Sequence, residues 1–278
     1  MSDPTFIEGA IGPLALHDLG GAGEDVLIVC HATGFLGRVY RAFAEEMTDH
    51  VRVVAIDFRA HGDSATPTNV EEFNWSGMAD DLTAAITALD ARTLHGFGHS
   101  MGGAALLETE RRQPGTFASA LVFEPIVPPG MFSDTGESPL SHAARGRLRS
   151  FPTRGDALQR YASKPPLGLF RADVLSDYVQ HGFRDSEHGV TLKCLPESES
   201  NTFTMAGRIH LGLMPEIELD VRVGRSGDGQ LPARLAPAVA EALPNGQLID
   251  FPTISHFGPL QDPVTVALVM LETMERAS

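Results

Sequence analysis

The sequence predicts an α/β fold in which helices cover both faces of a mostly parallel β-sheet. Two observations support this prediction: short apolar runs rich in Val, Ile and Leu recur along the chain, and segments with helical spacing lie between them. Continuous apolar runs suit strands that are covered on both faces. Strands that alternate with helices need crossover connections, which favours parallel pairing. At 278 residues, the chain is long enough for one core with an inserted lobe.

The elements follow from these patterns in chain order. The opening stretch "FIEGAIGPLALHDLGGAGEDVLIV" contains short strands and a GGAG turn, which indicate an antiparallel hairpin at one sheet edge. In the segment 75–90 the apolar residues recur at a period near 3.6, as in an amphipathic helix. The expected strands are 26–30, 51–57, 93–97, 118–124, 218–224 and 247–251, and the expected helices are 38–48, 75–90, 101–112, 231–242 and 263–275.

The alternation breaks down between residues 127 and 216, where Pro, Gly and Ser cluster and no strong apolar strand appears. A long loop without structure is uncommon in a compact domain. We therefore expect residues 127–216 to form an inserted lid of short helices, with the core built from 1–126 and 217–278. Its aromatic residues would supply an apolar ceiling over a substrate, or equally form the lid's own small core; they are Phe132, Phe151, Phe170, Phe183 and Phe203.

Composition excludes several classes of partner. Lys and Arg number 21 against 36 Asp and Glu, so the net charge of −15 argues against nucleic acid. No apolar run reaches the roughly 18 residues of a membrane helix, and the first residues lack a secretory pattern, so a cytoplasmic location is expected. Cys30 and Cys194 suggest neither a disulfide framework nor a metal site, and we expect no cofactor. The oligomeric state, a homodimer included, stays open.

A nucleophile is predicted at Ser100, within the pentapeptide "GHSMG". The pentapeptide joins a predicted strand to a predicted helix. A serine in so tight a turn needs the small neighbours that Gly98 and Gly102 provide. The N–H group of Met101, at the start of the helix, would stabilise an oxyanion above the serine. The alternative is a chance match in a chain with 28 glycines.

A serine hydroxyl becomes a good nucleophile only when a base removes its proton. Among the 11 histidines, His256 lies in the loop after the last predicted strand, at the edge where ligands bind in open α/β sheets. Asp262 and Pro263 read as the cap and first residue of the closing helix, which fixes the length of that loop. His31 is expected to hold its own loop by hydrogen bonding, and His99 to point away from the serine.

The histidine needs a carboxylate that orients its ring. Asp228 is the first candidate, because it follows a predicted strand in a Gly-rich turn; a simple turn aspartate is the alternative. Glu124, at the end of the preceding strand, is the second candidate. The other oxyanion donor is expected in the loop after residue 30, where we choose the N–H group of Thr33, with an uncertainty of one position.

Together, residues 98–102, the loop 31–34, "DFRAHGDS" at 57–64 and the late His256 resemble the α/β-hydrolase superfamily over nearly the whole chain. The resemblance implies an eight-stranded sheet, a lid after the sixth strand and the order serine, acid, histidine. Ala32 departs from the glycine that is usual in the family's oxyanion loop.

Serine at the turn, in place of the aspartate of epoxide hydrolases and haloalkane dehalogenases, implies acyl chemistry. The expected function is therefore a serine hydrolase that cleaves a small, apolar carboxylic ester or lactone through an acyl-enzyme. An acyltransferase or cofactor-free perhydrolase with the same triad is the alternative, as is a catalytically weak receptor for a small ligand. Family resemblance alone does not choose between them.

Overall fold

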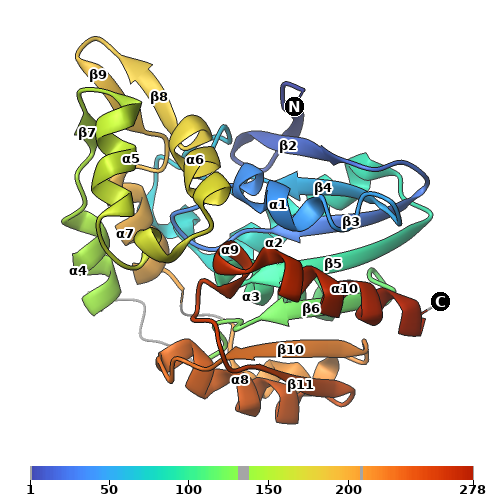
Figure 1. Ribbon diagram of the computed structural model, residues 1–278. Helices are drawn as coiled ribbons and strands as arrows, with labels where there is room; N and C mark the ends of the chain where they lie inside the picture. Colours follow the sequence, from blue (N-terminus) through green and yellow to red (C-terminus); the bar gives the residue numbers. More distant parts are fainter. Residues whose placement is uncertain (1, 131–137, 207–208, 278) are drawn as a thin grey trace.

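An eight-stranded sheet forms the centre of the computed structural model, which describes residues 2–130, 138–206 and 209–277 (Figure 1). The edge strand β1 pairs antiparallel with β2, as β2 does with β4, and the pairs from β4 to β11 are parallel. Across the sheet the strands are β1 (Thr5–Gly9), β2 (Gly12–Gly20), β4 (Arg52–Ile56), β3 (Asp25–Cys30), β5 (Thr93–His99), β6 (Ser119–Phe123), β10 (Val221–Ser226) and β11 (Gly246–Phe251).

The predicted strands are all present, and the edge hairpin is confirmed with a different turn. Residues 10–11 join β1 to β2, whereas the GGAG segment leads from β2 to β3. These two strands are not neighbours, because β2 pairs with β4.

Helices cover both faces of the sheet, as the sequence predicts. The expected helix 38–48 is replaced by a 3-10 turn and one short α-helix. The N–H of Gly37 donates to the carboxylate of Asp57 at the end of β4, so tertiary contacts outweigh helix propensity there. The helices of the core are η1 (Gly37–Tyr40), α1 (Arg41–Ala44), η2 (Val70–Phe73), α2 (Trp75–Leu89), α3 (Met101–Arg112), η4 (Leu211–Glu216), α8 (Leu231–Ala242), α9 (Gly258–Gln261) and α10 (Pro263–Ala277).

Alternation along the strands creates two apolar cores, one on each face. In β3, Leu27 and Val29 pack with residues of α1 and α10, whereas Val26, Ile28 and Cys30 pack with residues of α2, α3 and α8. Successive side chains of a strand point to opposite faces, so a continuous apolar run serves both cores. Cys30 is fully buried, as a small hydrophobic residue.

The lid lies between β6 and β10 in the sequence and gathers at one end of the sheet, on the left of Figure 1. The expectation of a purely helical lid is incomplete, because a small antiparallel sheet of order β7-β9-β8 accompanies the helices. These strands are two to four residues long, too short for a periodic signal. Its elements are α4 (Pro139–Arg145), β7 (Ser150–Phe151), α5 (Arg154–Ala162), η3 (Leu167–Leu169), α6 (Ala172–His181), β8 (Phe183–Ser186), β9 (Gly189–Leu192) and α7 (Pro196–Thr204).

The extent 127–216 remains a proposal for the lid. At its end, Met214 of η4 packs into the core cluster beneath the sheet. Of the expected ceiling residues, Phe151 and Phe183 pack on each other and on Tyr161 inside the lid. Phe170, in contrast, contacts the core, as described below, and Phe132 lies outside the described residues.

Candidate active site

Ser100 stands at a sharp turn between β5 and α3, with a backbone φ of 56° in the left-handed region. This conformation is strained for a residue with a Cβ and is typical of functional turns. The flanking glycines make the turn feasible. A Cβ on Gly98 would lie 2.6 Å from the Cα of Gly103, and one on Gly102 would lie 2.2 Å from the carbonyl oxygen of Cys30.

His256 brings its ring to this serine from the loop after β11, residues 252–257. Its Nε2 lies 3.2 Å from the Oγ of Ser100. The predicted cap of α10 is confirmed, since the Asp262 carboxylate accepts the N–H of Thr265 and Pro263 opens the helix. This cap fixes where the histidine loop ends.

Glu124 supplies the carboxylate at the other ring nitrogen. One oxygen lies 2.7 Å from Nδ1 of His256, and the other accepts the N–H of Ser226 at 2.7 Å. The side chain is fully buried, and the backbone φ of 46° is again left-handed. In the parallel pair β5–β6, His99 is opposite Phe123, so Ser100 and Glu124 both follow paired residues at the same sheet edge. The Glu124 carboxylate, the His256 imidazole and the Ser100 hydroxyl therefore lie in one hydrogen-bonded row.

The expectation that Asp228 contacts the imidazole is wrong. Its carboxylate accepts the backbone N–H of His256 at 2.9 Å and, two residues on, the N–H of Gln230 at 2.9 Å. The second bond is the turn motif that a short acidic side chain makes with its own backbone. Burial works to raise the pKa of Asp228, but the N–H groups of Gln230 and His256 outweigh it and lower the pKa. Asp228 thus holds the backbone of the histidine, and Glu124 its ring.

The loop after β3, residues 31–34, lies beside the start of α3. The Oγ1 of Thr33 donates to the Sδ of Met101 at 3.3 Å, which joins the two segments. The N–H groups of Ala32, Gly34 and Phe35 have acceptors within the protein. Among the described residues, none accepts from the N–H of Thr33 or of Met101.

Two buried histidines fix this loop. His31 donates from Nδ1 to the Ala32 carbonyl and accepts the N–H of Phe58 at Nε2, which confirms its expected structural role. His61 accepts the N–H of Gly34 at 3.0 Å. Burial lowers the pKa of His31 to about 3 and that of His61 to about 4, so both rings are neutral and each can accept a hydrogen bond. Sequence reasoning gave His61 no role, although it lies inside the quoted "DFRAHGDS" stretch.

The lid contacts the same loop through α6. The hydroxyl of Tyr178 lies 3.5 Å from the Gly34 carbonyl oxygen and accepts a hydrogen bond from Arg147 at 2.6 Å. Arg147 also forms an ion pair with Glu199 of α7. Three lid segments therefore converge on residue 34.

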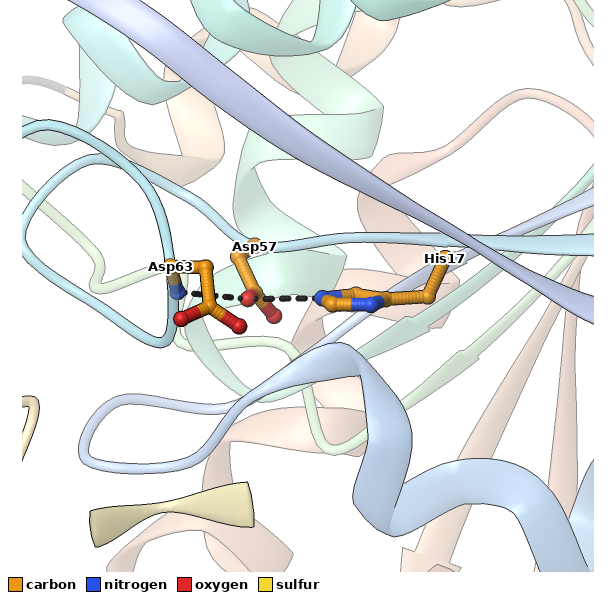
Figure 2. A group of neighbouring side chains, drawn as sticks. All are labelled: His17, Asp57 and Asp63. Carbon is orange, nitrogen blue, oxygen red and sulfur yellow. Dashed lines mark hydrogen bonds and ion pairs between the residues drawn. The ribbon is translucent and has the colours of Figure 1, made fainter. Parts of the chain in front are cut away.

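Figure 2 shows a second group of side chains, His17, Asp57 and Asp63, whose ligand atoms lie within 4.8 Å of one another. Hydrogen bonds already occupy these atoms. The Asp57 carboxylate accepts from Nε2 of His17 and from the N–H of Asp63, Nδ1 of His17 accepts from Arg38, and Asp63 pairs with Lys193. These contacts join β2, the end of β4 and the loop that follows it.

The model of the alpha/beta hydrolase family matches residues 26–267. The chain belongs to this family. The eight-stranded, mostly parallel sheet with its covering helices agrees with that assignment.

Relatives and solved structures point the same way. An Agrobacterium fabrum protein that bears the name "Putative carbamate hydrolase RutD" is 25% identical over 255 residues, 85% of this chain and 88% of that protein. A non-heme chloroperoxidase of Streptomyces lividans is 27% identical over 215 residues, 74% of this chain and 75% of that protein. The crystal structure of E-2-(acetamidomethylene)succinate hydrolase shares the fold, with a TM-score of 0.81 and 16% identity over 98% of this chain and 99% of that chain.

This chain is therefore an enzyme of the hydrolase class, and the receptor alternative is dropped. None of the helices in the described ranges combines the length and apolar character needed to cross a bilayer.

Proposed function

We propose that this hydrolase cleaves a small, apolar carboxylic ester or lactone through an acyl-enzyme on Ser100. The observation that carries the proposal is the row of side chains from Ser100 through His256 to Glu124, with contacts of 3.2 Å and 2.7 Å. Nucleophile, base and orienting acid in hydrogen-bonded sequence are the recurring arrangement of serine hydrolases.

In the proposed reaction, the Oγ of Ser100 attacks the ester carbonyl while Nε2 of His256 takes the hydroxyl proton. The tetrahedral intermediate collapses when His256 returns this proton to the leaving alkoxide, which departs as an alcohol. Water then attacks the acyl-serine by the same route, with its proton passing through His256, and releases the acid. Glu124 keeps the imidazole in the right tautomer and stabilises its charged form.

The N–H groups of Thr33 and Met101 are the proposed donors to the oxyanion. Met101 is the first residue of α3, so its N–H adds the positive end of a helix dipole to the hydrogen bond. Loss of one such donor costs about 10²–10³ in rate in a well-studied protease.

Aromatic side chains support an apolar substrate. Phe35, Phe170 and Phe257 contact one another, with ring centroids 5.7–5.9 Å apart, and Phe257 also contacts the ring of His256. They come from the β3 loop region, the lid and the histidine loop, and this apolar cluster lies beside the base His256. Such a cluster favours an apolar acyl or alcohol group over a charged one.

Reaction with a fluorophosphonate probe tests the proposal. We expect mass spectrometry to find the label on Ser100, and short-chain p-nitrophenyl esters to be hydrolysed. Labelling should vanish in Ser100→Ala and slow strongly in His256→Ala. A folded wild-type protein that neither reacts with the probe nor hydrolyses these esters would remove the proposal.

Perhydrolysis with the same three residues is the second candidate, favoured by the likeness to a non-heme chloroperoxidase. Here peroxide replaces water in the second step and releases a peracid. Acetate and hydrogen peroxide, with bromide oxidation as the readout, distinguish it. Halogenation faster than ester hydrolysis would make perhydrolysis the main reaction.

A further inference from the structure

A series of hydrogen bonds through Tyr40 and His99 joins the β3 loop to the histidine loop. The N–H of Ala32 donates to the hydroxyl of Tyr40 at 3.2 Å. This hydroxyl lies 2.7 Å from Nδ1 of His99, and Nε2 of His99 lies 2.8 Å from the carbonyl oxygen of His256. Tyr40 ends η1, and His99 immediately precedes the serine.

The direction of every proton in this series is fixed by its ends. The N–H of Ala32 can only donate, and the carbonyl of His256 can only accept. His99 must therefore carry its proton on Nε2, and the hydroxyl of Tyr40 must donate to Nδ1. Both side chains are completely buried. Burial, with the nearby ring of His256, holds the pKa of His99 well below its ordinary value, so the neutral ring that this arrangement requires is the stable one.

These hydrogen bonds join two loops that follow strands which are not neighbours in the sheet. The β3 loop and the histidine loop follow strands β3 and β11, and in the sheet three strands, β5, β6 and β10, separate them. On the other side of His256, Asp228 accepts the backbone N–H. The peptide groups of His256 are thus held from both sides, by His99 at the carbonyl and by Asp228 at the N–H.

We propose that Tyr40 and His99 are positioning residues, which set the distance between the oxyanion donor that follows Ala32 and the base His256. This inference rests on the proposed roles of Thr33, Ser100 and His256. Neither Tyr40 nor His99 touches the reacting atoms in this scheme. Misplacing a catalytic group by about 1 Å can cost about 10²-fold in rate, so a link between two such groups matters more for turnover than for binding.

The test is Tyr40→Phe, which removes one hydroxyl and keeps the ring. With p-nitrophenyl butyrate we expect kcat to fall about 10- to 100-fold while KM changes less than about twofold. Fluorophosphonate labelling of Ser100 should slow in parallel. In proton NMR, the signal of the Nδ1 proton that His256 shares with Glu124 should move, because the loop that carries His256 loses its brace.

Ser119→Ala is the matched control. The Ser119 hydroxyl lies 2.9 Å from Nδ1 of His95, which is on the same strand as His99 but nearer the start of that strand. This control also removes a buried hydroxyl from a histidine, so it should lower the melting temperature to a similar degree, and it should leave kcat and the His256 proton signal at wild-type values.

The variant His99→Phe gives an independent measurement, since it breaks both bonds at once. If the two residues act as one bridge, Tyr40→Phe combined with His99→Phe should lose no more activity than His99→Phe alone. Should one single variant be too unstable to purify, the other carries the same comparison with Ser119→Ala.

The outcomes separate the two proposals. Wild-type kcat in Tyr40→Phe, or an equal loss in Ser119→Ala, would overturn the positioning role while the reactive Ser100 stands. An unreactive Ser100 in the wild type would overturn the proposed function and the positioning role together.

Discussion

At the scale of single residues, two carboxylates divide the work around one histidine. Glu124 contacts the ring of His256, and Asp228 contacts its backbone. Only a contact with the ring can select the tautomer in which Nε2 faces the serine. The two residues should therefore respond differently to removal of their charge.

We predict that Glu124→Gln lowers kcat by about 10³–10⁴, by analogy with acid-to-amide changes in serine proteases. Asp228→Asn should lower it less than about tenfold, because the amide oxygen can still accept the His256 N–H. Steady-state ester hydrolysis by both variants, with circular dichroism to confirm folding, makes the comparison. The reverse order of effects would return the acid role to Asp228.

This pair also marks where sequence reasoning reached its limit. Both acids follow strands at the same sheet edge, and the sequence names both. Which one reaches the ring depends on the left-handed backbone at Glu124 and on the Asp228 side chain turning back to the N–H of Gln230. Neither feature has a periodic signal. The meeting of Ser100 and His256, in contrast, is predictable, because a glycine-flanked turn and a capped helix leave clear residue patterns.

At the scale of elements, the close approach of α3 to the end of β3 is what places Met101. Gly102 allows it, since a Cβ there would lie 2.2 Å from the Cys30 carbonyl oxygen, and this atom belongs to rigid backbone. Helix and strand cannot separate without moving the serine turn.

Gly102→Ala should therefore reduce activity by at least about tenfold and lower the melting temperature by several degrees. Gly155→Ala is the control: this glycine lies in α5, its added Cβ would come no closer than 3.5 Å to the Thr153 hydroxyl, and alanine favours helix. Thermal unfolding and ester hydrolysis provide the readouts. Full activity in Gly102→Ala would contradict the close packing.

Within the lid, a largely buried ion pair joins Arg147 to Glu199 of α7, beside Gly34 of the core. Arg147→Met would strand the Glu199 carboxylate, and we expect a loss of about 3 kcal/mol in the free energy of unfolding. The double variant Arg147→Met/Glu199→Gln should recover part of this loss, as measured by urea denaturation. A double variant less stable than the single one would show that the pair is not the source of the effect.

The least accurate predictions of elements share one cause, because these elements depend on contacts with residues elsewhere in the chain. The helix expected at 38–48 is short because Asp57, fixed by β4, captures the N–H of Gly37. The lid strands were missed because they are short and exist through pairing with one another. The long strands and α2 were predicted well, because elements with a buried face have regularly spaced apolar residues in the sequence.

At the scale of the whole molecule, buried neutral histidines link folding to pH. The folded-state pKa values of His31 and His61 are about 3 and about 4, below the ordinary value of 6.5. Between these pKa values and pH 6.5, the two histidines therefore bind protons in the unfolded chain but stay neutral in the folded protein. Their contribution to stability is complete above pH 6.5 and is lost as the pH falls toward 4.

Between about pH 6 and pH 4, each of these two rings should reduce the free energy of unfolding by at most about 1.4 kcal/mol for each unit that the pH falls. Urea denaturation across this range measures the slope. The variant His61→Gln should show a shallower slope than the wild type. An unfolding free energy that stays constant from pH 6.5 to pH 4 would contradict the neutral, buried state of both rings.

The lid is not a separate body resting on the sheet. Val174 and Leu175 of α6 belong to the same apolar cluster as Val39 and Phe43 of the core, so the two parts fold around shared interior. An engineer who seeks a new substrate range by grafting a relative's lid onto this scaffold would have to transplant the matching interior residues of η1 and α1 as well. A graft of the lid alone would replace the α6 side chains of this cluster and leave those of η1 and α1 without the residues that they pack against.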